Sequence, residues 1–276
     1  MLISWIVDFQ HRQLPEFFTR RERWYRDHDF RLQCRLATRV IVSSRHAQEV
    51  LGTFQPGCVS KSRVLHFVAN PLAYGDPTDL PALRERYGID GPYFHVPNQF
   101  WAHKNHRLIL DALELLHRRG ERVLVVSTGA TSDYRQPRYY DELAAHADAL
   151  GVRESFRTLG VVPYDDLVGL MRHAIAVINP SRSEGWSTTV EEAKSLGKRV
   201  ILSDIPVHRE QAPRDGVYVD PHDPAGLAEA LMSLWTSFDP AADRERSEVA
   251  RRELPQRIRA FGETYQGIVL EAAGVS

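Results

Sequence analysis

One stretch of the chain, from Ala174 to Asp204, has the pattern of a strand, a loop, a helix and a second strand. The apolar run Ala174–Ile178 predicts a buried strand, and Val200–Leu202 predicts the next one. A helix is expected to start near Thr188, and Gly197 stands where a left-handed C-terminal cap would end it. Strands joined in this way run parallel, so a ligand would lie beyond the carboxyl end of the first strand, near the amides of the helix start.

Two carboxylates frame the loop of this unit, Glu184 before the helix and Glu192 more than a turn inside it. A ligand laid over the helix start could meet both. Free amides and hydroxyls between them come from Gly185, Ser187, Thr188 and Thr189. The alternative is a capping box, formed by Thr188 with Glu191 or by Thr189 with Glu192, which would only start the helix. Spacing alone favours the capping box.

The same alternation of strands and helices extends over most of the chain and predicts an α/β protein with a parallel sheet covered by helices on both faces. Strands are expected near Tyr93–Pro97, Arg122–Ser127, Phe156–Leu159, Ala174–Ile178, Val200–Leu202 and Val217–Val219. Helices are expected near Asn105–Arg119, Arg138–Leu150, Tyr164–Arg172, Thr188–Leu196 and Pro224–Thr236.

The segment before Gly75 has a pattern of its own. Three strands are expected, at Leu2–Val7, Arg39–Ser43 and Val64–Val68. The helices between them are expected at Pro15–Ala37 and from a Ser44 cap to just before Pro56. At the other end of the chain, a last helix is expected from about Pro255 to Ala272.

The segment SEGWSTTVEEAKSLGKRVILSDIPVHRE resembles the donor-site signature of the retaining glycosyltransferases of family 4, and its Glu-x7-Glu spacing matches at Glu184 and Glu192. These enzymes have the GT-B fold of two facing Rossmann-like domains. The resemblance implies transfer of a hexose from a nucleoside diphosphate sugar, with retention of configuration, to a saccharide or lipid-linked acceptor in the synthesis of cell-surface polysaccharide or glycoconjugate. Two other classes stay open: a nucleotide-sugar-binding protein with impaired catalysis, and a sugar-nucleotide epimerase of the same architecture.

The resemblance also implies a domain organisation. Residues 1–74 would form a partial N-terminal, acceptor-side domain, residues 75–254 a complete nucleotide-sugar domain, and residues 255–276 a helix that crosses back to the first. A whole N-terminal half would need more strands, on the order of a hundred residues. A separately encoded N-terminal segment is one way to supply them.

Roles for the loop residues follow from the same resemblance. Glu184 would bind hydroxyls of the donor sugar and Glu192 the nucleotide ribose. The other donor contacts expected in this loop are Gly185, Trp186 and the amides of Ser187, Thr188 and Thr189, the last three facing the diphosphate.

Further site residues follow other strands. Lys104, in PNQFWAHKNH, would face the diphosphate, with Asn98 and Gln99 where many relatives carry an Arg. A solvated lysine at a helix start is the alternative, although the helix dipole disfavours a cation there. The remaining candidates are Thr128 and Gly129 at a strand end, Val161 and Val162 near the nucleobase, and His11 facing the cleft. Buried packing would equally explain the valines, and a solvated loop would explain His11.

No cofactor is expected, because the nucleoside diphosphate sugar is a substrate. No metal is expected either, since no Asp/His set has ligand spacing and Lys104 with the helix amides could do what a divalent ion would.

Composition excludes several classes of protein. The net charge of −1 over 276 residues argues against a dedicated nucleic-acid binder. Two cysteines, Cys34 and Cys58, suit a reducing cytosol rather than a disulfide framework. No apolar run is long enough to span a membrane, and the start lacks the features of a secretion signal. A cytoplasmic protein is expected. The arginines near Arg20 suit a solvated helix face, and a peripheral contact with anionic lipid at the inner face of the membrane stays open.

Overall fold

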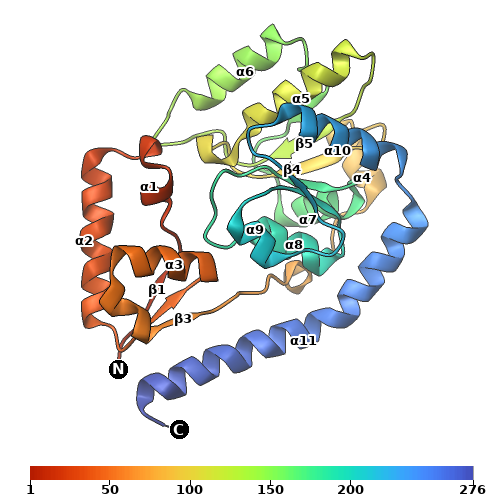
Figure 1. Ribbon diagram of the computed structural model, residues 1–276. Helices are drawn as coiled ribbons and strands as arrows, with labels where there is room; N and C mark the ends of the chain where they lie inside the picture. The colour runs from red at the N-terminus through yellow and green to blue at the C-terminus, as the bar shows by residue number, and fades with distance from the viewer. Residues whose placement is uncertain (276) are drawn as a thin grey trace.

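The computed structural model describes residues 1–275, and Ser276, the last residue of the expected 255–276 segment, lies outside the described residues. The chain forms two parallel sheets that lie apart in space (Figure 1). The smaller has the order β1-β2-β3, with strands Ile3–Ile6, Arg39–Val42 and Ser62–Val64. The larger has the order β6-β5-β4-β7-β8-β9. Its strands are β4 (Phe94–Pro97), β5 (Val125–Thr128), β6 (Phe156–Thr158), β7 (Val177–Asn179), β8 (Val200–Ser203) and β9 (Val217–Val219).

Around the smaller sheet, local capping decides where the helices begin. The helix predicted from Pro15 is interrupted: a short 3-10 turn, η1 (Pro15–Phe17), comes first, and Thr19 then caps α2 (Arg20–Leu36) through a capping box with Glu22. Ser44 caps α3 (Arg45–Phe54), as predicted. The third strand lies earlier than the predicted Val64–Val68. The remaining short elements here are α1 (Gln10–Gln13), η2 (Pro56–Lys61) and η3 (Pro71–Tyr74).

Helices cover both faces of the larger sheet, as the alternation predicted. Neighbouring residues of one strand point to opposite faces: Ile201 packs with Leu231 of α10 (Pro224–Thr236), whereas Val200 packs with Val190 of α8 (Thr188–Leu196). The helices are α4 (Leu80–Tyr87), α5 (His106–Arg118), α6 (Tyr139–Ala149), α7 (Tyr164–His173), α8 (Thr188–Leu196), α9 (Pro206–Gln211) and α10 (Pro224–Thr236). Helix α9 was not predicted, and the predicted C-terminal cap at Gly197 is confirmed by its φ of 70°.

The last helix is longer than predicted. Helix α11 runs from Pro240 to Ala273 and contains Pro255, which was expected to begin it. Figure 1 shows α11 leaving the larger sheet and returning to the smaller one. There Ile268 packs against Ile41 and Leu65. A salt bridge between Glu271 and Arg39 lies on the same contact.

Both cysteines are buried free thiols, as the sequence indicated. Within residues 1–275, no helix has the length and the apolar character that crossing a membrane requires.

Candidate active site

The order of strands in the larger sheet places a crevice between β4 and β7. Strands β5 and β6 lie on one side of β4, and β8 and β9 lie beyond β7. The chain therefore leaves these two neighbours in opposite directions, which opens a crevice beyond their carboxyl ends. Lys104 follows β4 at the end of the 3-10 turn η4 (Ala102–Lys104), and Glu184 follows β7. Two residues far apart in the sequence thus come to the same place.

A local anchor holds Lys104 beside β7. The next residue, Asn105, has a left-handed φ of 60°, a conformation that asparagine tolerates better than most residues. Its Nδ2 donates to the carbonyl oxygens of Pro180 at 3.1 Å and of Pro221 at 2.9 Å. These bonds fix the turn that carries Lys104 against the loop that carries Glu184.

Lys104 and Glu184 form an ion pair in the crevice. Nζ of Lys104 donates to Oε1 of Glu184 at 2.6 Å, and the Glu184 side chain is 8% exposed. Burial raises the pKa of this carboxyl group, but the charge and hydrogen bond of Lys104 outweigh it, so the pKa of Glu184 lies below its usual value. Glu184 is therefore ionised near neutral pH. It can accept hydrogen bonds from hydroxyl groups, while Lys104 can offset negative charge.

The start of α8 is built differently from either predicted capping box. Ser187 is the N-cap, and its Oγ accepts from the amide of Val190 at 3.4 Å. Asn179, at the end of β7, donates to the same Oγ at 2.6 Å and so closes the loop. The capping-box interpretation is wrong, because the cap lies one residue before Thr188. The amides of Thr188 and Thr189 have no acceptor recorded among residues 1–275, as is usual in a first helical turn.

Glu192 lies one turn further along α8. Its side chain accepts from the hydroxyl of Tyr164, at the start of α7, at 2.9 Å. Burial raises the pKa of Glu192, and the Tyr164 bond offsets this only in part. Sequence reasoning missed Tyr164 as a neighbour of Glu192, because the residue starts a different helix and no local pattern links the two.

The ends of β4 and β5 complete one wall of the crevice. Asn98 is buried, and its Oδ1 accepts from the hydroxyl of Thr189 at 3.3 Å. Its Nδ2 has no hydrogen-bond partner in the described part of the chain. Gly129 has a φ of 142°, and a Cβ there would lie 2.5 Å from the Asn98 carbonyl oxygen, so only glycine fits this approach. Gln99 is exposed. The hydroxyl oxygen of Thr128 is hydrogen-bonded to Nε2 of the buried His95 at 2.9 Å.

The two valines proposed near a nucleobase differ. Val161 is 77% exposed and open to a ligand, whereas Val162 packs partly against the apolar cluster around Leu83 and Tyr93.

His11 is not solvated, so that alternative is wrong, while its role at the crevice stays a prediction. It lies on α1 with 1% exposure, and its Nε2 is 2.9 Å from Oδ1 of Asp27. The ring packs edge-on against Phe30, and burial lowers the pKa of His11 despite Asp27. Gln10 contacts the Glu184 loop instead: its Nε2 donates to the carbonyl oxygen of Ser183 at 3.3 Å.

A cavity of about 380 Å³ lies between the two halves of the chain at Glu184. Gly185 is close to its N-terminal wall, because a Cβ on Gly185 would lie 1.9 Å from the Val7 carbonyl oxygen. Trp186 lies against the segment after β3: its Nε1 donates to the Phe67 carbonyl oxygen at 3.1 Å, and its ring stacks on His66. The cavity is lined by Trp5, Val7, Asp8, Gln10, Ser43, Phe67, Glu184, Gly185, Trp186 and Thr188.

Among the described residues, no group of three or more His, Cys, Asp or Glu side chains could hold a metal ion. That the site works without a metal stays a prediction.

Residues 81–251 match the family model described as glycosyl transferases group 1. A D-inositol 3-phosphate glycosyltransferase of Xylanimonas cellulosilytica is 32% identical over 168 residues, which cover 59% of this chain and 39% of the relative. The D-rhamnosyltransferase WbpZ of Pseudomonas aeruginosa is 28% identical over 200 residues, 69% of this chain and 48% of the relative. The matched region thus spans less than half of either relative.

A solved structure similar to this chain is that of Anabaena Alr3699/HepE in complex with UDP and glucose, with a TM-score of 0.75. The sequences are 18% identical, and the match covers 96% of this chain and 71% of that one. At 18% identity, this similarity shows a shared fold only. With the family match, it confirms the α/β architecture of GT-B type.

Proposed function

The chain belongs to the glycosyl transferases group 1 family, and we propose that it transfers a hexose from a nucleoside diphosphate sugar, with retention of configuration, to a saccharide or lipid-linked acceptor. The observation that carries this proposal is the pair of Lys104 and Glu184 at the crevice between β4 and β7, next to the open amides of α8. A cation, an ionised acceptor and free amides at one point are what a sugar diphosphate needs.

Each part of the donor has a partner in this proposal. Glu184 accepts hydrogen bonds from sugar hydroxyls, and Lys104 and the amides of Thr188 and Thr189 meet the diphosphate. Glu192 binds the ribose, where hydroxyl donors would stabilise its ionised form against burial. The exposed Val161 is free to lie against the base. Because the similar Anabaena structure is a complex with UDP and glucose, UDP-glucose is the first donor to test.

The proposed mechanism depends on stabilising the negative charge that develops on the leaving group. When the bond between the sugar and the diphosphate breaks, charge develops on the leaving phosphate oxygen. Lys104 and the first amides of α8 offset that charge without moving, which lowers the barrier. The leaving phosphate then takes the proton of the acceptor hydroxyl. In this mechanism a divalent ion has no task, so activity in a chelator is part of the proposal.

Titration calorimetry of the full chain with UDP, GDP and ADP, each with and without EDTA, tests the donor site. One of the diphosphates should bind with the same affinity in the chelator, and the matching labelled nucleotide sugar should release its sugar. Absence of binding by all three would overturn the proposed function. Loss of binding in EDTA would overturn the metal-free mechanism alone.

A further inference from the structure

Ser187, the residue just before the open amides of α8, is held at two points by one side chain. Its amide donates to Oε1 of Gln211 at 3.1 Å, and its carbonyl oxygen accepts from Nε2 of Gln211 at 3.0 Å. Both residues are 2% exposed. Gln211 is the last residue of α9, so this clamp fixes the α8 start from a neighbouring element.

The clamp requires one orientation of the Gln211 amide, and Glu191 selects it. Nε2 of Gln211 also donates to Oε1 of Glu191 at 3.1 Å. A side-chain amide can turn over and exchange its oxygen and nitrogen, but a carboxylate only accepts. The NH2 group must therefore face Glu191, which leaves the oxygen for the Ser187 amide.

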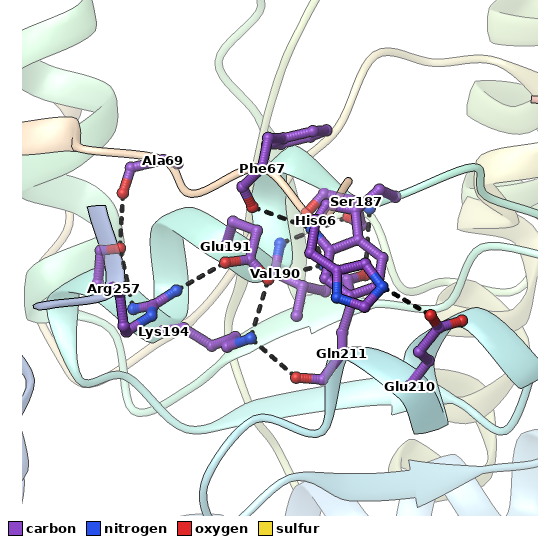
Figure 2. Close-up of polar contacts among 12 residues, drawn as sticks. His66, Phe67, Ala69, Ser187, Val190, Glu191, Lys194, Glu210, Gln211 and Arg257 are labelled. Atoms are coloured by element: carbon purple, nitrogen blue, oxygen red, sulfur yellow. Dashed lines mark hydrogen bonds and ion pairs between the residues drawn. The ribbon is translucent and has the colours of Figure 1, made fainter. Parts of the chain in front are cut away.

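Two cations hold the Glu191 carboxylate in place, as Figure 2 shows. Lys194 donates to its Oε1 at 2.9 Å, and Arg257 of α11 donates to its Oε2 at 2.6 Å. Nζ of Lys194 also donates to the main-chain carbonyl oxygen of Gln211 at 2.8 Å. Lys194 therefore contacts both residues of the Glu191–Gln211 hydrogen bond. A buried carboxylate with two cationic partners costs less to maintain than one left alone.

We propose that Gln211, oriented by Glu191, is a positioning residue for the donor diphosphate, an inference that rests on the proposed function. Gln211 occupies the amide of Ser187 and fixes its carbonyl group, so the amides of Thr188 and Thr189 are the ones presented to the crevice. Gln211 acts through Ser187 and touches no part of the donor itself. Its loss should therefore weaken contacts to phosphate and spare those to the nucleoside.

The test compares Gln211→Met with the wild-type chain for binding of UDP and of uridine, or of whichever nucleoside diphosphate binds and its nucleoside. Methionine keeps the length of the side chain and removes its hydrogen bonds. UDP affinity should fall about tenfold, as for one or two lost hydrogen bonds, with uridine affinity nearly unchanged. Gln48→Met is the matched control, because Nε2 of Gln48, on α3, donates to Oγ of Ser62 in the N-terminal sheet at 2.8 Å. It should leave both affinities unchanged.

A second variant separates orientation from packing. In Glu191→Gln, the new side chain can either accept a hydrogen bond from the Gln211 amide or donate one to it. The Gln211 amide then has no single preferred orientation. By itself, Glu191→Gln should lower UDP affinity about threefold. Added to Gln211→Met, it should lower the affinity no further, since the two changes disrupt the same contact.

An unchanged UDP affinity in Gln211→Met, or an equal loss of uridine and UDP, would overturn the positioning role. If Gln211→Met does not fold, the ratio of UDP to uridine affinity in Glu191→Gln decides in the same way. If the wild-type chain binds no nucleoside diphosphate, the proposed function fails and this inference fails with it.

Discussion

Nζ of Lys104 lies 2.6 Å from Oε1 of Glu184, and the two residues follow neighbouring strands at the point where the order of the sheet reverses. The pair places a cation and an ionised carboxylate beside the first turn of α8.

Lys104→Met should lower the rate of donor turnover about 10²- to 10³-fold, because the charge on the leaving phosphate loses its cationic partner. Hydrolysis of labelled nucleotide sugar measures this rate. Lys61→Met is the matched control, since Nζ of Lys61 donates to the Ala37 carbonyl oxygen at 2.9 Å in the N-terminal half. Turnover near the wild-type value in Lys104→Met would contradict the role of the cation.

Glu192→Ala should weaken binding of the nucleoside diphosphate by about 1.5 to 3 kcal/mol, the range for a hydrogen bond to a charged group. Calorimetry on a folded variant measures it. Unchanged affinity would show that Glu192 does not bind the ribose.

Glu184→Ala should reduce donor turnover while free nucleoside diphosphate still binds, because Glu184 is assigned to the sugar. Calorimetry and the hydrolysis assay together check the division. A loss of nucleotide affinity as large as that of Glu192→Ala would contradict it.

The two carboxylates should have opposite effects on the pH dependence of stability. Burial raises the pKa of Glu192, so its contribution is present below its ordinary pKa and is lost as pH rises through the raised value. Despite burial, Lys104 lowers the pKa of Glu184, so its contribution is present above the ordinary pKa and is lost as pH falls through the lowered value.

As pH rises, the stability of Glu192→Gln relative to the wild-type chain should therefore increase above about pH 4.3, and that of Glu184→Gln should decrease below about pH 4.3. Free energies of unfolding from urea titrations at several pH values measure both slopes. Slopes of the same sign would show that one of the two pKa directions is wrong.

Gly185→Ala should lower the free energy of unfolding by about 1 to 3 kcal/mol, the usual cost of overpacking, because its Cβ would meet the Val7 carbonyl oxygen. Gly262→Ala, in α11, is the control: no atom lies within 4 Å of the added Cβ, and alanine favours a helix. Equal effects of the two changes on thermal unfolding would argue against the close approach of the Glu184 loop to the N-terminal segment.

Much of the fold was readable from the sequence because its signals are local. The bounds of α8 and α10 agree with the predicted Thr188–Leu196 and Pro224–Thr236, since each helix has an apolar face and a capping residue at its start. Pro255 misled the prediction of the last helix. A proline lacks one backbone donor, yet α11 continues through it, with Ala250 and Leu254 buried just before it and Ile268 and Ala272 buried further on.

The candidate site was predictable only where a motif carried it. Glu184, Glu192 and Lys104 follow from their sequence segments. The burial of His11 could not be predicted in this way, because it depends on Asp27 and on an aromatic cluster from α2 and α3. The Gln211 clamp was equally invisible, since it joins two helix ends through tertiary contacts alone.

The central claim is that this crevice binds a nucleoside diphosphate sugar and breaks its glycosidic bond with retention. Proton NMR of the anomeric signal, recorded as the full chain hydrolyses UDP-glucose or the sugar of whichever nucleoside diphosphate it binds, tests this most directly. The account predicts that the first sugar released has the configuration of the donor, and that Lys104→Met suppresses the signal. Release of the opposite anomer first, or an equal rate in Lys104→Met, would contradict it.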